Sequence, residues 1–137
     1  MRTTRERACV MGATLIAVLL LAACGGSSKP SYCSSVTDLE NSVKGLTNVN
    51  VIKNGTSSLK SQVQKIENDA KSVVSGAQSD FPNETSAITS SVNALASSVK
   101  QISGKPSASQ VVTIGQQATA AANAVKSFAN ATSSKCS

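Results

Sequence analysis

The amino-acid sequence predicts an all-α fold, which we expect to be an antiparallel up-down-up-down four-helix bundle with a short first helix. From residue 32 onward the large apolar residues recur at intervals of three and four, as they do on one face of a helix. No segment of this region alternates apolar and polar residues as a β-strand does. Clusters of glycine, asparagine and proline divide the pattern into four stretches, and short connections between helices favour antiparallel neighbours.

Each stretch carries a narrow apolar stripe of the kind that packs one helix against another. The four stripes are Tyr32, Val36, Leu39, Val43 and Leu46; Leu59, Val63, Ile66, Ala70, Val73 and Ala77; Ile88, Val92, Leu95, Val99 and Ile102; and Val111, Ile114, Ala118, Ala121, Val125 and Phe128. Alanine supplies several of these positions, so we expect the helices to pack tightly around a modest core. Tyr32 is expected to plug one end of the bundle.

The breaks between the stripes predict where each helix begins and ends. The first helix follows Pro30 and ends at residues 48–50, and the second opens at residues 54–56. Pro82 would remove a hydrogen bond from a continuous helix and clash with its preceding turn, so a turn separates the second helix from the third. The third helix ends before Pro106, and Ser107 with Gln110 has the pattern of a capping box for the fourth.

The first 24 residues have the order of a secretory signal. Arg2, Arg5 and Arg7 make a basic start, residues 10–21 carry no charge, and the segment closes on Leu21-Ala22-Ala23-Cys24. These last four residues resemble the lipobox of bacterial lipoproteins. The resemblance implies that a peptidase removes residues 1–23 as a signal peptide and that the thiol of Cys24 receives a diacylglyceryl group.

The lipobox resemblance also implies a location and a first partner. Diacylglyceryl-Cys24 would anchor the chain firmly in the lipid bilayer, because stable anchoring takes about two acyl chains. The protein would then lie on the extracytoplasmic side of the cell membrane. One alternative is an uncleaved membrane anchor, but the apolar run is shorter than the roughly 20 residues of a comfortable span. The other is an ordinary signal peptide, which would leave the cysteine at the cut unexplained.

The rest of the chain divides into a linker over residues 24–31 and one folded domain over residues 32–137. Residues 25–31 contain no apolar side chain, and their glycines and serines predict a flexible spacer. The domain resembles small helical envelope proteins of unassigned function, rich in alanine, serine and valine, from high-GC Gram-positive bacteria. This resemblance supports a bundle and implies no activity.

Two of the four cysteines remain for pairing if Cys9 leaves with the signal peptide and Cys24 is acylated. Exported proteins usually pair such cysteines. Cys33 lies at the start of the first helix and Cys136 just past the last, and these two points share one end of an up-down-up-down bundle. We therefore expect a Cys33–Cys136 disulfide. Two free thiols, or a bridge between two chains, are the alternatives.

The composition argues against catalysis and against a metal or cofactor site. The chain has no histidine, which is the commonest general base and a common metal ligand. The carboxylate pairs Asp38/Glu40 and Glu67/Asp69 are two residues apart, a spacing that does not bring side chains together on a helix, so we expect them to be solvated. No serine lies in a Gly-x-Ser-x-Gly frame.

The charge distribution argues against a nucleic-acid partner. The formal net charge is +6, but all three arginines lie in the signal peptide. The lysines that remain are scattered, whereas nucleic-acid surfaces cluster Arg and Lys and often add aromatic residues for base stacking. We therefore expect solvated helix faces.

Two classes of function remain. The first is a structural or protein-interaction module that meets an envelope protein, and the narrow, alanine-containing stripes favour it. The apolar loop with Val49, Val51 and Ile52, at the bundle end away from the disulfide, is then expected to face the partner. The second is a small carrier that holds an apolar ligand between the helices. A cavity above roughly 300 Å³ lined by valine and isoleucine would favour this carrier.

Overall fold

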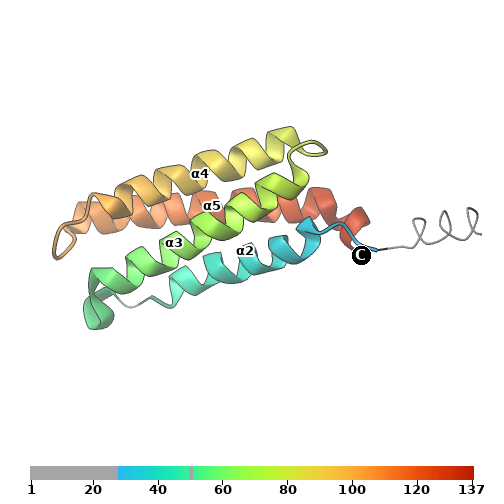
Figure 1. The fold of residues 1–137 in the computed structure, drawn as a ribbon. Coiled ribbons are helices and arrows are strands. Elements are labelled where there is room, and N and C mark those ends of the chain that lie inside the picture. Colours follow the sequence, from blue (N-terminus) through green and yellow to red (C-terminus); the bar gives the residue numbers. More distant parts are fainter. Residues whose placement is uncertain (1–27, 50) are drawn as a thin grey trace, which may run out of the picture.

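Four helices make up the described part of the chain, with no strand among them (Figure 1). The computed structural model describes residues 28–49 and 51–137, and within these the side chains of all residues except 51–53. The helices are α2 (Tyr32–Thr47), α3 (Val51–Ala77), α4 (Pro82–Lys100) and α5 (Ala108–Cys136). The all-α prediction is therefore confirmed. The predicted signal peptide and the acylation site Cys24 lie outside the described residues.

The helices form a ring in which each one packs against two neighbours. Consecutive helices pack together, and α2 closes the ring against α5. Figure 1 shows that consecutive helices run in opposite directions. This is the antiparallel up-down-up-down bundle that the short connections predicted. Its first helix has 16 residues and its last has 29, so at about 1.5 Å per residue α5 is nearly 20 Å longer than α2.

The apolar stripes meet in the centre of the ring and form a single core. Leu39, Ile66, Ile88, Leu95 and Phe128, which come from all four helices, are 0% exposed. The stripe of α5 is the exception, because its first member, Val111, is 53% exposed. The antiparallel α2 starts beside the end of α5 and is too short to reach the beginning of α5. One end of the last stripe is therefore left uncovered.

The helix boundaries agree with the breaks in the sequence, with one correction. Pro82 opens α4 in its first turn, and Ser107 and Gln110 form the predicted capping box of α5. However, α3 begins at Val51, so Val51 and Ile52 lie in a short helical segment where we expected a loop. Gly55 then interrupts α3 with a φ of 71°. Glycine adopts this left-handed conformation without a steric penalty, so the chain can bend there before the main part of the helix.

Polar contacts between helices involve two of the carboxylates. The Ser42 hydroxyl on α2 donates to Asp69 on α3, and the Lys65 ammonium reaches both Ser42 Oγ, at 2.6 Å, and Asp69 Oδ2, at 2.9 Å. On the next face, the Lys100 ammonium lies 2.9 Å from Glu67 Oε1 and links α4 to α3. We expected Glu67 and Asp69 to be solvated. Their side chains are only 19% and 20% exposed, because each meets a partner from a neighbouring helix.

The end of the bundle where α2 begins and α5 finishes is held by the predicted cysteine pair and by three aromatic rings. The Sγ atoms of Cys33 and Cys136 are 2.05 Å apart, at disulfide distance. Tyr32 is 3% exposed and makes edge-to-face contacts with Phe81 and Phe128. The expectation that Tyr32 plugs this end is therefore confirmed. We call this the disulfide end and the opposite one the distal end.

Candidate functional site

A hollow opens between α2 and α5 towards the distal end. Its volume is about 430 Å³, and apart from Lys44 no charged residue is among those that line it. Apolar side chains dominate the lining, among them Val43, Leu46, Leu59, Ile114, Ala118 and Ala122. We call this space the inner hollow. Its walls come from three helices, and it lies where the short α2 leaves α5 uncovered.

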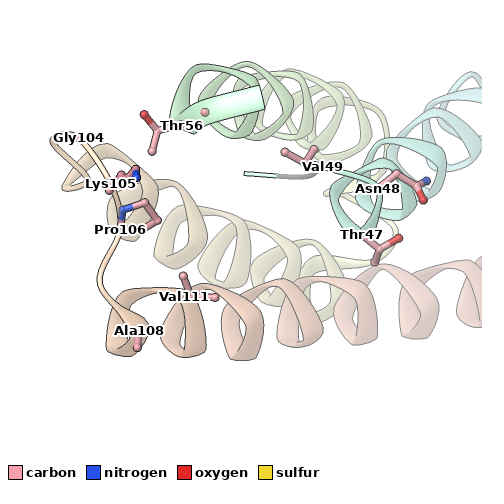
Figure 2. Close-up of a pocket in the computed structure, with 10 residues that line it drawn as sticks. Thr47, Asn48, Val49, Thr56, Gly104, Lys105, Pro106, Ala108 and Val111 are labelled. Atoms are coloured by element: carbon pink, nitrogen blue, oxygen red, sulfur yellow. The ribbon is translucent and has the colours of Figure 1, made fainter. Parts of the chain in front are cut away.

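A second and larger hollow continues from the first to the tip of the bundle, and we call it the tip hollow. Its volume is about 960 Å³. The two hollows share Thr47, Val49, Pro106 and Val111, so they are adjacent, and we call them together the distal groove. In Figure 2, Val111 of α5 projects towards this space, with Val49 and the loop residues Lys105 and Pro106 around it.

Glycine and alanine on α5 keep the inner hollow open. A Cβ atom built on Gly115 would have no neighbour within 4 Å, although Gly115 lies inside the helix. By contrast, a Cβ on Gly76 would come within 3.1 Å of Tyr32 Cβ, so Gly76 allows α3 and α2 to approach closely. Gly76 therefore serves close packing of two helices, whereas Gly115 lines the groove.

Among the residues whose side chains the structure describes, lysine is the only charged type that lines the distal groove. Lys44 on α2 borders the inner hollow, and Lys105 in the loop before α5 borders the tip hollow. Both side chains are exposed. The two ion pairs among the described side chains join Lys65 to Asp69 and Lys100 to Glu67, so neither groove lysine takes part in them.

The residues that the sequence singled out lie at different ends of the bundle. Cys33 and Cys136 are together at the disulfide end, far from the groove. Val49 is half-buried, packs against the core and borders both hollows. The side chains of Val51 and Ile52 are outside the described part, so their role as a partner surface stays a prediction.

The residues of α5 that form the groove floor were not singled out from the sequence. Val111 and Ile114 were assigned to the core stripe, and Val112, 60% exposed, was assigned to nothing. The unequal lengths of the apolar stripes could have indicated the groove. The first stripe ends 14 residues after it begins, whereas the last runs for 17 residues before its terminal turn. A longer helix in a ring must extend past its shorter neighbour.

The Ser42 cluster is a structural contact and not a second site. A serine hydroxyl beside a lysine ammonium resembles the arrangement of some nucleophilic serines. However, Ser42 is 2% exposed in the middle of α2, so a substrate could reach its hydroxyl only if α2 and α3 separated. The Gln62 amide also donates to the Ser42 carbonyl oxygen at 2.5 Å, which adds to the link between these helices.

Searches for metal and membrane-spanning features give negative results for the described residues. Within residues 28–49 and 51–137, no group of three or more His, Cys, Asp or Glu residues is placed to hold a metal ion. None of the four described helices is long and apolar enough to cross a membrane.

Comparison with protein-family models, with curated protein sequences and with solved structures gives no significant match.

Proposed function

We propose that this chain is a lipid-anchored envelope protein that carries an apolar ligand in the distal groove. The observation that supports this function is the inner hollow, which has a volume of about 430 Å³ and is lined by Val43, Leu46, Leu59 and Ile114. Ligand sites in proteins are typically concave, mostly apolar and roughly 300–1,000 Å³ in volume. The hollow therefore meets the condition that favours a carrier over a purely structural module.

The position of the groove suits a tethered carrier. If Cys24 is acylated, the linker joins the membrane to the disulfide end, where α2 begins. The groove then lies at the other end of a helix of 29 residues, roughly 40 Å away at 1.5 Å per residue. In this arrangement the open mouth faces away from the anchoring bilayer, where it can exchange ligand with another envelope component.

The exposed valines of α5 support a second candidate, the structural or protein-interaction module. Val111 and Val112 are 53% and 60% exposed, and they lie side by side in the first turns of α5. A partner protein that covers them would remove apolar surface from water. This candidate predicts a stable protein complex and no preference for small amphiphiles.

Acylation of Cys24 can be tested by metabolic labelling. We expect the wild-type chain to incorporate an alkyne analogue of palmitate in its native host or a related lipoprotein-processing strain. The Cys24→Ser variant should incorporate none, because it lacks the thiol that receives the diacylglyceryl group. Cys9→Ser is the matched control, since Cys9 leaves with the signal peptide, and it should be labelled like the wild type. Equal labelling of Cys24→Ser would disprove the lipid anchor.

Ligand binding can be tested by filling the groove. In a chain that starts at residue 24 and carries Cys24→Ser, we expect dodecanol to bind saturably and to shift the amide NMR signals of Leu46 and Ile114. Gly115→Phe should weaken binding at least about tenfold, because the ring displaces two or more methylene groups worth about 0.8 kcal/mol each. The free energy of unfolding of Gly115→Phe should not fall, since glycine is a poorer helix former than phenylalanine.

Two control variants separate blocking of the groove from general effects on α5. Gly115→Ala leaves most of the hollow open, and Ala120→Phe places the same ring at an exposed position of α5 that does not line the groove. Both should bind dodecanol within about twofold of the parent chain. Absence of saturable binding by the parent, or equal binding by Gly115→Phe, would refute the carrier.

A further inference from the structure

The distal groove becomes more polar along its length. The inner hollow is walled by aliphatic side chains such as Val43, Leu59 and Ile114. The tip hollow adds Asn48, Thr56 and Lys105 to its lining (Figure 2). A hydrocarbon would use only the first part of this space. A molecule with an apolar tail and a polar head would match both parts.

The positive charge along the groove selects the sign of that head group. Lys44 and Lys105 are the charged residues that line the described groove, and neither takes part in an ion pair of the described side chains. The first turn of α5 also borders the tip hollow through Ala108, and the N-terminal end of a helix dipole favours negative charge. Lys44 therefore places positive charge beside the inner hollow, and Lys105 with the first turn of α5 places it beside the tip hollow.

We infer that the ligand of the distal groove is an anionic lipid, whose acyl chain lies between α2 and α5 and whose negative charge is attracted by Lys105 beside the tip hollow and by Lys44 beside the inner hollow. This inference rests on the proposed carrier function and names the class of ligand. A neutral lipid would leave the two ammonium groups without a counter-charge, and a cationic lipid would be repelled by them.

The test compares three probes that share one tail. Dodecanoate, dodecanol and dodecylammonium are titrated into the Cys24→Ser chain that starts at residue 24 and contains the whole described bundle. Their concentrations stay below the solubility limit of dodecanol and the critical micelle concentrations of the two charged probes. Dodecanoate should bind about fivefold to twentyfold more tightly than dodecanol, since two exposed charge pairs of ordinary strength add this much. Dodecylammonium should bind more weakly than dodecanol. The advantage of dodecanoate should shrink as salt is raised.

Lysine variants identify the groups that recognise the head. Lys44→Ala and Lys105→Ala should each weaken dodecanoate binding about twofold to fivefold, and the double variant should bind dodecanoate no better than dodecanol. Dodecanol binding should be unchanged in all three variants. Lys126→Ala is the matched control, because Lys126 is an exposed lysine of α5 that does not line the groove. It should leave binding of both probes unchanged.

The outcomes separate this inference from the carrier function. If dodecanol binds as tightly as dodecanoate, or if Lys126→Ala weakens dodecanoate as much as the groove variants do, the inference is wrong and the carrier stands. If none of the three probes binds saturably, the carrier and the inference both fail. A probe that binds only because two chains associate around it would show a stoichiometry of one per two chains by native mass spectrometry. That result would overturn the inference in favour of an interface between copies.

Discussion

Replacing Cys33 and Cys136 with serine is expected to lower the free energy of unfolding by about 2–5 kcal/mol. The bridge joins residues 103 positions apart and so closes almost the whole folded domain into one loop. In the chain-entropy model, a loop of about 100 residues contributes up to about 4.7 kcal/mol by restricting the unfolded chain. For a domain of this size the melting temperature should fall by roughly 8–20 °C. Urea unfolding and thermal unfolding, both followed by circular dichroism, measure the loss.

The single variants test whether the effect comes from the bridge itself. Cys33→Ser and Cys136→Ser each remove the whole bridge, so the double variant should be no less stable than either single variant. A reducing agent should lower the stability of the parent by a similar amount and leave the double variant unchanged. Additive losses from the two single substitutions, or no response of the parent to reduction, would show that the thiols are not paired.

The sequence was sufficient to predict the fold because each helix is determined by a local spacing of apolar residues, and because the two cysteines lie at opposite ends of the folded domain. The spacing of Leu39, Ile66, Leu95 and Val125 defines one face on each helix, and burying four such faces together leaves few arrangements. All four residues are at most 2% exposed. The positions of Cys33 and Cys136 then required the first and last helices to be neighbours at one end.

The groove could not be predicted in the same way because it depends on how helices of unequal length are placed. The spacing of apolar residues in the last helix assigns Val111 and Ile114 to the core. Whether a stripe is covered depends on where its neighbour ends, and here α2 stops at Thr47. Gly55 adds a bend that no hydrophobic period records. The contact between Ser42 and Asp69 escaped prediction for a related reason, because spacing within one helix says nothing about partners on another.

The uneven coverage of α5 separates stability from function along one helix. Its last turns carry Phe128 and Cys136, which hold the disulfide end, whereas its first turns carry Val111 and Gly115, which border the groove. A bundle that is firmly held at one end can leave the other end open without losing its fold. Substitutions at the two ends should therefore have different consequences, binding at one and stability at the other.

Phe128→Ala is the substitution in the core that should cost most, about 3–5 kcal/mol in the free energy of unfolding. The ring is 0% exposed and meets Phe81 and Tyr32 edge to face, with centroids 5.7 Å and 6.3 Å away. Its removal leaves a cavity and breaks both aromatic contacts, each worth about 0.5–1.5 kcal/mol. Urea unfolding of the intact disulfide form measures the effect.

Tyr32→Phe is the matched control at the same cluster, and it should be neutral or stabilising by up to about 1 kcal/mol. The substitution keeps the ring that packs against Phe81 and Phe128, and it removes a buried hydroxyl for which the described residues provide no hydrogen-bond partner. A buried polar group without a partner costs free energy, so its removal relieves that cost. If Tyr32→Phe were instead as destabilising as Phe128→Ala, the Tyr32 hydroxyl would have to form a stabilising hydrogen bond. The placement of that hydroxyl without a partner in the aromatic cluster would then be wrong.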